Sequence, residues 1–482
     1  TQDGRPKDAD WAERITSVPA ATIRALARRM AGERTMLTCS WSIQRADHGE
    51  QPYWALILLA ACLGQIGLPG GGFGFGYGSS GNIAEPPLAF PGPAMETKTN
   101  PAGLSIPAAR ITDCLLHPGE TYQSNGKAGT YPDIRLVYWA GGNPFHHHQD
   151  LNRLRRAWSK PETIIVHEPW WTATARHADI VLPATTSLER NDIGCAARDR
   201  FVMAMHKAIA PVGEARDDFA ILRDLAARLG CEAAFTEGLD ESGWVRRLYD
   251  QFRERARINL VPDFEAFWDK GWVEIPRRVE EYDLFADFRA DPERSKLHTP
   301  SGRIELYSEL IAGFGYDDCP PHPTWIEPAE WLGATGAADY PLHLVSSQPR
   351  YKLHSQMDDG PVSARGKIDG REAVALNPAD ATARGIAEGD VVRIFNARGA
   401  CFAGAVISES VRPGVAKLSC GAWWDPHGDA CAHGNANVLT RDQGTSRLGQ
   451  GPSSATALVE VERAQGPVPP VRAFVPPDVA AE

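Results

Sequence analysis

The sequence predicts an α/β protein in which parallel-sheet domains are followed by a C-terminal β-barrel. In the middle of the chain, continuous apolar strands alternate with amphipathic helices, which is typical of a parallel sheet covered on both faces. After residue 339 the pattern changes to short strands separated by Gly and Asn turns. A series of this kind over about 130 residues indicates a barrel.

The composition limits the class of protein. A chain of 482 residues is too long for one ordinary core, so we expect two to four domains. With 43% hydrophobic and 23% charged residues, it has the balance of a folded globular protein. The net charge of -11 argues against a nucleic-acid partner, because phosphate binding needs clustered Lys and Arg. We expect no transmembrane segment: the most apolar run, residues 53–68, is too short and predicts a buried helix.

The nine cysteines occur singly, without any CxxC or similar cluster. The sequence therefore encodes neither a structural zinc site nor an iron–sulfur cluster. Unpaired thiols fit a reducing compartment, or a folded protein that is exported with its thiols free. The localisation thus stays open between periplasm and cytoplasm.

The elements suggest four parts of the chain. Residues 1–120 read as the remainder of an α/β domain whose front end lies upstream, with helices within 10–30, a strand at 35–42 and a glycine tract at 67–82. That tract is either a flexible connection, which we favour, or a loop over a ligand. The other parts are an α/β dinucleotide-binding domain (121–338), the barrel domain (339–465) and a Pro-rich tail (466–482), either strapped on the surface or disordered.

Within the second part, the pattern becomes strand–helix–strand. Gly230 is expected to end the amphipathic helix at 216–230. The segment at 235–335 is rich in Trp, Arg, Pro and Asp and is expected to wrap around the domain. The expected strands lie within 133–144, where the strand is followed by a glycine turn, and at 162–171 and 178–184; the expected helices are 149–158 and 216–230.

The stretch GGNPFHHHQD, residues 141–150, sets three histidines in a row after a glycine turn. Adjacent side chains diverge on any regular backbone, so the pattern argues against a common metal ion. The stretch lies where a strand ends and a helix begins, which is where α/β sheets bind ligands. Glycines allow close approach of the backbone, and a helix N-terminus offers N–H groups to a phosphate. We therefore expect a ligand that carries phosphate.

Polar residues also follow the next strands. Glu168 ends a strand beside His167 and is suited to accept from ribose hydroxyls, as an acid does in dinucleotide folds. Arg190 suits a bidentate phosphate or carboxylate contact. Asp218 begins a helix, so it either caps that helix, which we favour, or accepts N–H groups from a guanine edge.

The barrel region holds two polar segments. SSQPRYKLHSQ (346–356) is dense in donors without balancing carboxylates, which indicates either a ligand with many acceptors or a solvated loop. GNANVLTRDQGTSRLGQG (434–451) is a second polar, glycine-bearing loop. Paired tryptophans point either to a pocket lining or to core aromatics; they are Trp170, Trp171, Trp423 and Trp424.

Together these motifs resemble a known family. VHEPWWTATARHADIVLPATTSLERNDIG, GGNPFHHHQDLNRL, PRYKLHSQ and NANVLTRDQGTSRLGQG, in this order, are similar to the molybdopterin oxidoreductases of the dimethyl sulfoxide reductase family. The nearest branch is that of the biotin sulfoxide, trimethylamine N-oxide and dimethyl sulfoxide reductases, whose catalytic chain lacks iron–sulfur clusters. The resemblance runs from Gly4 to about Glu462. It implies Rossmann-like domains and a terminal barrel of the double-psi type.

The resemblance also implies a molybdenum ion held by two molybdopterin guanine dinucleotides. The residues that would hold one dinucleotide are Gly142, Asn143, His147, His167 and Glu168, with Arg190 and Asp218 toward its guanine end. The residues that would contact the pterins from the barrel are Ser346, Gln348, Arg350, His354, Ser355 and Gln356, with Asn437 and Gln450 nearby. His146 and His148 would then orient and cap this stretch.

The implied reaction is transfer of an oxygen atom from an S-oxide or N-oxide, which yields sulfide or amine plus water. Electrons would come from a cytochrome or a soluble reductase, as in bacterial anaerobic respiration. In this branch a serine oxygen ligates molybdenum, and no residue of the chain matches it. The catalytic residue is thus unknown, and we expect the ligand serine before residue 1, in a part removed by truncation rather than absent from a natural half-gene.

Two alternatives remain at this stage. One is a related molybdenum hydroxylase or dehydrogenase, which a cysteine or selenocysteine metal ligand would indicate in place of serine. The other is a non-catalytic pterin-binding fragment, which would carry no molybdenum. A classical NAD dehydrogenase is disfavoured, because no GxGxxG follows a strand.

Overall fold

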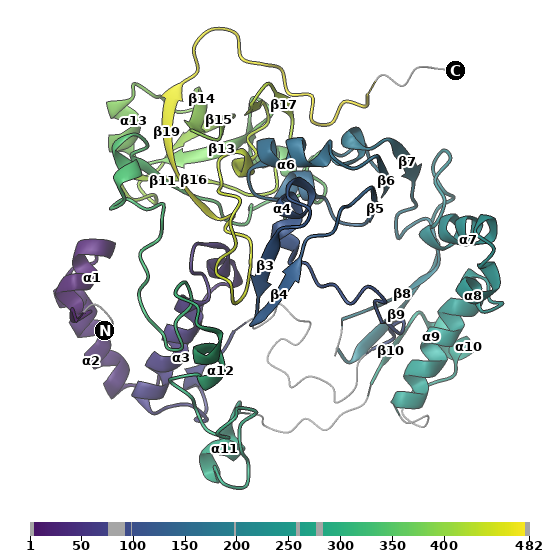
Figure 1. Cartoon of the computed structure of the whole chain (residues 1–482), viewed down its shortest axis with the longest axis horizontal. Helices are drawn as coiled ribbons and strands as arrows, with labels where there is room; N and C mark the ends of the chain where they lie inside the picture. The colour runs from purple at the N-terminus through teal and green to yellow at the C-terminus, as the bar shows by residue number, and fades with distance from the viewer. Residues whose placement is uncertain are drawn as a thin grey trace.

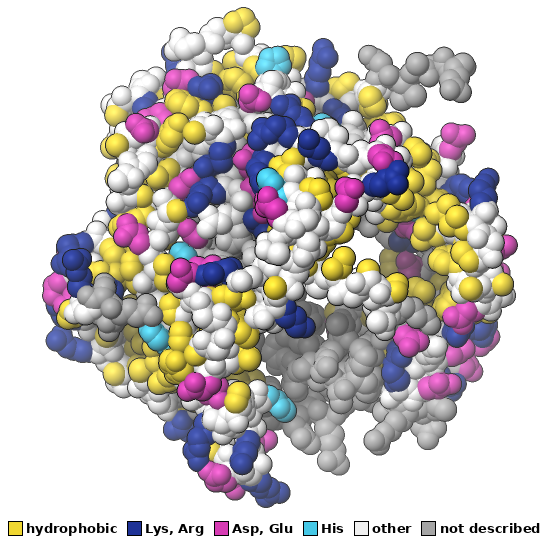
Figure 2. Space-filling model, in the orientation of Figure 1, with side chains coloured by type: hydrophobic (Ala, Val, Ile, Leu, Met, Phe, Trp, Pro, Cys, Tyr) yellow, Lys and Arg dark blue, Asp and Glu magenta, His cyan; other side chains and the backbone are white. Residues whose placement is uncertain are grey.

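The structure is a computed structural model, and it describes residues 4–75, 92–97, 99–196, 199–256, 261–275 and 283–477. Figure 1 shows the barrel beside a small parallel sheet, with the N-terminal helices and a group of later helices on opposite sides of the molecule. On the face in Figure 2, acidic and basic side chains are interspersed, so this face carries no broad basic surface. Among the described residues, no helix combines the length and apolar character that crossing a bilayer requires.

The N-terminal part is mostly helical. It contains α1 (Ala9–Thr16), α2 (Ala20–Gly32) and α3 (Gln51–Leu63), and a two-strand parallel pair of β1 (Met36–Leu37) with β2 (Gly72–Phe73). The prediction of a strand at 35–42 is wrong beyond β1, because Trp41–Arg45 forms a 3-10 helix. Ser40 caps this helix by accepting a hydrogen bond from the Ser42 amide. Residues 76–82 of the glycine tract lie outside the described residues.

Helix α3 differs from the expected buried helix. It ends at Leu63, where Gly64 takes φ +67°, and only Gln51 and Ala60 are buried. Leu59 is 40% exposed. The helix packs against the two short strands β1 and β2 and against the 3-10 helix Trp41–Arg45.

The parallel sheet confirms the strand–helix–strand prediction. Its order is β5 (Leu136–Ala140), β6 (Thr163–Glu168) and β7 (Ile180–Pro183), all parallel. Between β5 and β6 runs α6 (Leu151–Trp158), whose Leu151 and Leu154 are fully buried. Before this sheet come α4 (Ile111–Leu116) and the hairpin of β3 (Thr121–Ser124) with β4 (Lys127–Thr130).

The wrapping extension contains a second small core that the sequence did not indicate. An antiparallel sheet joins β8 (Asp192–Cys195), β9 (Phe201–Met205) and β10 (Trp272–Glu274). Beside it, Tyr249 and Phe252 of α9 (Glu241–Arg255) and Phe267 of α10 (Phe264–Lys270) are fully buried in a separate cluster. The remaining helices of this region are α7 (Asp218–Arg228), α8 (Glu232–Thr236), α11 (Ala286–Ala290) and α12 (Glu309–Phe314).

The C-terminal region is a closed barrel, as predicted. Six strands form a ring in the order β13, β16, β11, β19, β14, β15, and β15 pairs back to β13. Two of the pairs, β11 with β16 and β13 with β15, are parallel. The bounds are β11 (Leu342–Val345), β13 (Arg371–Leu376), β14 (Val391–Asn396), β15 (Gly399–Ile407), β16 (Val415–Leu418) and β19 (Thr456–Arg463), with α13 (Pro378–Ala383), β12 (Lys367–Ile368), β17 (Pro426–His427) and β18 (Ala430–Cys431) attached.

The parallel sheet and the barrel share one hydrophobic core. Phe145, which follows β5, stacks on Trp424 of the barrel with ring centroids 5.2 Å apart and planes 7° apart. Asn152 of α6 donates to the carbonyls of Arg398 and Asp429 at 3.1 and 2.9 Å. These contacts fix one edge of the sheet against the barrel, and the candidate site lies between them.

Candidate functional site

A cavity of about 910 Å³ lies between the carboxyl edge of the parallel sheet and the barrel. Segments that are far apart in the sequence meet there, which is the arrangement expected for ligands at a strand edge. The lining residues are Arg45, Gly142, Asn143, His146, His147, Glu168, Trp170, Thr172, His354, Ser355, Gln356, Met357, Asp359, Gly360, Pro361, Trp423, Pro452 and Ser454. Seven of the fifteen residues predicted to bind the cofactor are among them: Gly142, Asn143, His147, Glu168, His354, Ser355 and Gln356.

The three adjacent histidines point to three different partners. His146 is buried, and its Nε2 accepts from the amide of Ala173 at 3.4 Å. His147 Nε2 is 2.9 Å from the hydroxyl of Ser355, across the cavity on the barrel side. His148 Nδ1 donates to the carbonyl of Gln149 at 2.9 Å. The rings therefore diverge, and His147 is the one that bridges the sheet edge to the barrel.

The local backbone corrects one part of the sequence argument. The glycine turn leads into α5 (Pro144–His147), which is only one turn long, and α6 begins separately after Asp150, whose side chain caps it. A helix of one turn has almost no macrodipole, so the expected phosphate site at a helix N-terminus is not built here. The open backbone of the turn remains available, since Gly141 and Gly142 both have positive φ.

Burial keeps the imidazoles of the cavity neutral. The pKa of His147 is lowered to about 4 by burial and by the neighbouring His354 and Arg45. Burial also lowers the pKa of His146 well below its usual range and the pKa of His354 to a lesser degree. Neutral imidazoles can each donate one hydrogen bond and accept another.

Glu168 is the carboxyl group that titrates near neutral pH in this cavity. Burial raises its pKa to about 7, while the hydrogen bond from the Thr172 hydroxyl, 3.1 Å away, lowers it by less. The side chain thus exchanges between a hydrogen-bond donor and an anionic acceptor over the physiological range.

His167 does not line the cavity. Its side chain is 1% exposed, its Nδ1 lies 2.7 Å from Asp218 Oδ1, and its Nε2 lies 2.7 Å from the Tyr138 hydroxyl. With Nδ1 donating to the carboxylate, Nε2 accepts from the phenol. The expectation that Asp218 caps its helix is wrong: Asp217 is the N-cap of α7 and accepts from the Ala220 amide. Asp218, half exposed, is instead held by His167.

Arg190 also lies outside the cavity lining. It donates to the carbonyl of Thr185 at 2.9 Å and to Asp192 at 3.3 Å, beyond the end of β7. Arg190 and Asp218 therefore follow the same sheet edge as Glu168 but stand away from the cavity itself.

On the barrel side, His354, Ser355 and Gln356 line the cavity because their segment crosses Gly421 closely. A Cβ at Gly421, where φ is +85°, would lie 2.2 Å from the His354 carbonyl oxygen. Trp423 holds the same segment by donating from Nε1 to the Ser355 carbonyl at 2.8 Å.

The other barrel residues predicted from the sequence stand behind the lining. Ser346 is buried and its hydroxyl has no partner, and Gln348 accepts from the thiol of Cys420 at 3.3 Å. Arg350 lies over the ring of Tyr351, and Asn437 is buried in its loop. Gln450 takes φ +50° and donates to the carbonyl of Gln123 at 2.7 Å.

Several lining residues were not found from the sequence. Arg45 and Ser454 come from segments with no recognisable motif, and only the folded chain places them here. Of the paired tryptophans, Trp170 and Trp423 line the cavity, whereas Trp424 is buried against Phe145. A more apolar cavity of about 660 Å³ lies apart from this site, around α3 and residues 285–311, and brings none of the predicted residues together.

Comparisons with known proteins agree with this architecture. The family described as "Molybdopterin oxidoreductase" matches residues 19–228, and the "Molydopterin dinucleotide binding domain" matches residues 342–458, which includes most of the barrel. A biotin sulfoxide reductase of Cereibacter sphaeroides is 54% identical over 96% of this chain and 63% of its own length. A dimethyl sulfoxide/trimethylamine N-oxide reductase of the same organism is 49% identical over 98% of this chain and 60% of its own.

A trimethylamine-N-oxide reductase of Salmonella typhi is 46% identical over 98% of this chain and 58% of its own length. The chain thus spans about three fifths of the length of these relatives. Acetylene hydratase from Pelobacter acetylenicus has a similar fold, with a TM-score of 0.56 at 18% identity over 73% of this chain and 46% of that chain. The two matched regions cover more than half of the sequence, and the chain belongs to the molybdopterin oxidoreductase family.

Proposed function

We propose that the protein containing this chain is a molybdenum-dependent reductase that removes an oxygen atom from an S-oxide or N-oxide. The observation that carries the proposal is the cavity between sheet edge and barrel, lined by neutral imidazoles, an arginine and polar backbone. Relatives named for biotin sulfoxide, dimethyl sulfoxide and trimethylamine N-oxide, at 46–54% identity, support this substrate class. The balanced reaction consumes two electrons and two protons and releases water with the sulfide or amine.

The residues present fit a pterin dinucleotide. The hydroxyls of Ser346 and Ser347 are buried without a hydrogen-bond partner. Burial of an unpaired hydroxyl costs free energy, unless a ligand supplies the missing hydrogen bond. The Gly141–Gly142 turn leaves backbone open to a ligand. We therefore propose the bis(molybdopterin guanine dinucleotide) form of the cofactor, which supplies the two-electron redox chemistry when bound.

In this proposal the chain binds, orients and shields the cofactor. Gly142, Asn143, His147 and Glu168 hold one nucleotide directly, and His167 acts through Asp218, which with Arg190 faces the guanine end. The barrel residues proposed for the pterins are Ser346, Gln348, Arg350, His354, Ser355, Gln356, Asn437 and Gln450. The proposed domain boundaries fall at residues 121, 339 and 466.

Glu168 has a separate proposed task. With a pKa of about 7, it holds a proton on its carboxyl group in about half of the molecules at neutral pH. It can thus donate to a ligand acceptor or accept from a ribose hydroxyl without a large energetic cost. The metal ligand is proposed to be a serine that precedes this chain, and the electron donor a cytochrome or a soluble reductase.

The test is to purify the natural protein that contains this chain and measure its metal and nucleotide. We expect one molybdenum per chain and two GMP per molybdenum after acid hydrolysis. With reduced viologen as donor, the protein should consume biotin sulfoxide, dimethyl sulfoxide or trimethylamine N-oxide. Protein without molybdenum would indicate a non-catalytic binding module, and molybdenum without turnover of any oxide would favour a dehydrogenase.

A further inference from the structure

The last described residues form a strap that crosses from the barrel to the parallel sheet. After β19, residues 466–477, here called the strap, run across the barrel and reach the end of the sheet region (Figure 1). The strap has no regular secondary structure, yet Ala473 is only 2% exposed. An irregular segment of this kind stays in place only where other residues bind its backbone.

On the sheet side, Arg176 binds the strap. It lies in the 3-10 helix Ala175–His177, between β6 and β7, and donates to the carbonyls of Arg472 at 3.1 Å, Ala473 at 3.0 Å and Val475. The same guanidinium donates to the carbonyl of Trp171 at 3.2 Å. One side chain thus joins the loop that carries the cavity residues Trp170 and Thr172 to the strap.

On the barrel side, two buried side chains bind it. Arg371, 3% exposed, donates to the carbonyl of Pro469 at 2.7 Å. Asp425 accepts from the amide of Arg472 at 2.5 Å. The strap is therefore attached to both sides of the cavity at once.

Phe474 of the strap packs behind the cavity wall. Its ring centroid lies 5.3 Å from that of Trp423 and 5.0 Å from that of His433, both in edge-to-face geometry. The ammonium of Lys367 lies 5.5 Å from the Phe474 centroid. Trp423 lines the cavity and stacks on His146, so the strap contacts the cavity wall directly from behind.

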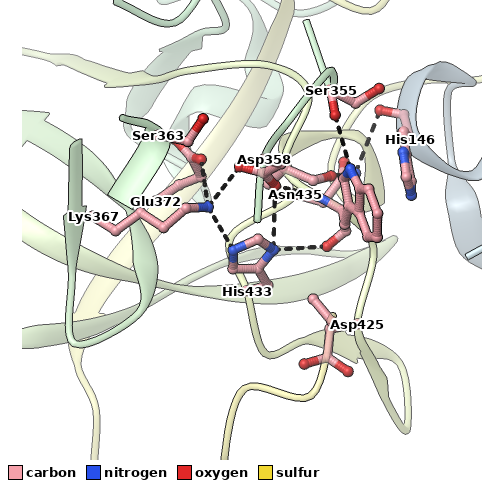
Figure 3. A network of polar contacts seen from close by, with 12 residues as sticks. His146, Ser355, Asp358, Ser363, Lys367, Glu372, Asp425, His433 and Asn435 are labelled. Carbon is pink, nitrogen blue, oxygen red and sulfur yellow. Dashed lines mark hydrogen bonds and ion pairs between the residues drawn. The ribbon is translucent and has the colours of Figure 1, made fainter. Parts of the chain in front are cut away.

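A buried ionic network lies next to Trp423, and Figure 3 shows four of its members, Asp358, Lys367, Glu372 and His433. The network consists of Lys352, Asp358, Lys367, Glu372 and His433, with side chains at most 8% exposed. Lys367 donates to His433 Nε2 at 2.7 Å, so His433 carries its proton on Nδ1 and donates to the Trp423 carbonyl at 3.0 Å. Asp358 accepts from the Trp423 amide at 3.0 Å. Phe474 covers this network on the side of Lys367 and His433.

We propose that the strap is the closing element of the cavity: Phe474 and Arg176 position Trp423 and hold the sheet edge against the barrel, and detachment of the strap opens the cavity for exchange of its nucleotide. The identity of the nucleotide rests on the proposed function; the positioning of Trp423 does not. Phe474 and Arg176 act through other residues and are positioning residues.

The experiment compares Phe474→Ala, Arg176→Ala and a chain shortened after residue 465 with the natural holoprotein. Val475→Ala is the matched control, because Val475 is 54% exposed and the substitution retains the contact of its carbonyl with Arg176. Phe474→Tyr keeps the ring and should restore the behaviour. The first measurement is hydrogen–deuterium exchange of residues 354–361 and of the Trp423 amide. The second is the rate at which bound guanine nucleotide leaves the protein on dilution.

We expect both rates to rise about tenfold in Phe474→Ala, which is the order expected for losing aromatic pair contacts, and more in the shortened chain. Val475→Ala and Phe474→Tyr should match the natural protein. An unchanged rate of nucleotide release would overturn the proposal, even if hydrogen–deuterium exchange becomes faster. The strap would then have a structural role alone. If the natural protein holds no nucleotide, the proposed function fails, and the exchange rates alone decide whether the strap positions Trp423.

Discussion

The two walls of the cavity are built from opposite kinds of chemistry. The sheet wall presents neutral groups: imidazoles whose charge burial suppresses, and a carboxyl group protonated near neutral pH. The barrel wall rests on full charges, two lysines and two carboxylates that neutralise one another out of contact with water. The sheet wall can therefore adjust its protonation to a ligand, whereas the barrel wall is fixed by charges that cannot be separated cheaply.

The largest effect is expected on the barrel wall. Asp358→Asn leaves Lys352 and Lys367 with Glu372 as the remaining anion of the network, so we expect unfolding to become easier by about 3–5 kcal/mol in chemical denaturation. Asp359→Asn, the same change at the exposed neighbouring residue, is the control and should cost less than about 0.5 kcal/mol. Equal effects at both positions would contradict the difference between buried and exposed charge.

The same network gives a pH dependence. Burial alone would raise the pKa of Asp358, but His433 and the ammonium groups of Lys352 and Lys367 together outweigh it and hold this pKa at about 2, below the ordinary value of a free aspartate. This stabilisation is complete above about pH 4 and is lost as the pH falls toward 2. Between these pH values, the unfolding free energy of the natural protein should fall more steeply with decreasing pH than that of Asp358→Asn. Parallel curves of unfolding free energy against pH would contradict this prediction.

A smaller effect is expected where the barrel wall crosses Gly421. In Gly421→Ala the Cβ would meet the His354 carbonyl, so the segment that carries His354 must shift. We expect the unfolding free energy to fall by about 2–4 kcal/mol, measured by chemical denaturation. Gly428→Ala has a similar positive φ of +63° without any atom within 4 Å, and should cost about 1–2 kcal/mol. A comparable loss in both variants would mean that backbone strain, not the close crossing, sets the effect.

The sheet wall should respond in the opposite direction. Because burial raises the pKa of Glu168 to about 7, ionising it costs folding free energy at high pH. The free-energy penalty of ionising Glu168 is absent below about pH 4, the pKa of this group in the unfolded chain. It grows above that pH and is complete once the pH has risen through 7. In protein freed of cofactor, Glu168→Gln should therefore stabilise the fold by about 1–2 kcal/mol at pH 8 and by almost nothing at pH 4. A loss of stability at pH 8 would show that the ionised form is well bound.

The smallest effect is expected at an exposed ion pair. Arg135 and Glu162, at the opposite end of the sheet, are 72% and 61% exposed and form a two-bond pair. We expect the unfolding free energy of Arg135→Ala to be indistinguishable from that of the natural protein, at low ionic strength and in about 1 M salt alike, because water and salt screen an exposed pair. A loss as large as that of Asp358→Asn would remove the distinction between the two kinds of charge.

The sequence predicted the parts whose pattern is local. The three parallel strands and α6 follow from continuous apolar runs and from Leu151 and Leu154 on one helical face. The barrel follows from its series of short strands. The small core around Tyr249 was missed, because strands of three to five residues with mixed polarity do not stand out from loops.

The candidate site shows the same limit at the level of single residues. His167 and Glu168 are neighbours in one strand and point to opposite faces, so at most one of them can face the cavity. Asp217 and Asp218 are adjacent acids, and no sequence rule decides which one caps α7. Arg45 reaches the cavity through contacts between distant segments, which one sequence does not reveal.

The ring of barrel strands has a consequence for how the protein is made. β19 pairs with β11 and with β14, so its eight residues complete a ring whose other five strands all precede it in the chain, the last of them ending at Leu418. During translation the edges of the earlier strands therefore stay unpaired until β19 is made. Unpaired strand edges can pair with other chains and cause aggregation. The barrel wall forms only after Arg463 has left the ribosome, and any cofactor that needs both walls must be inserted after that moment.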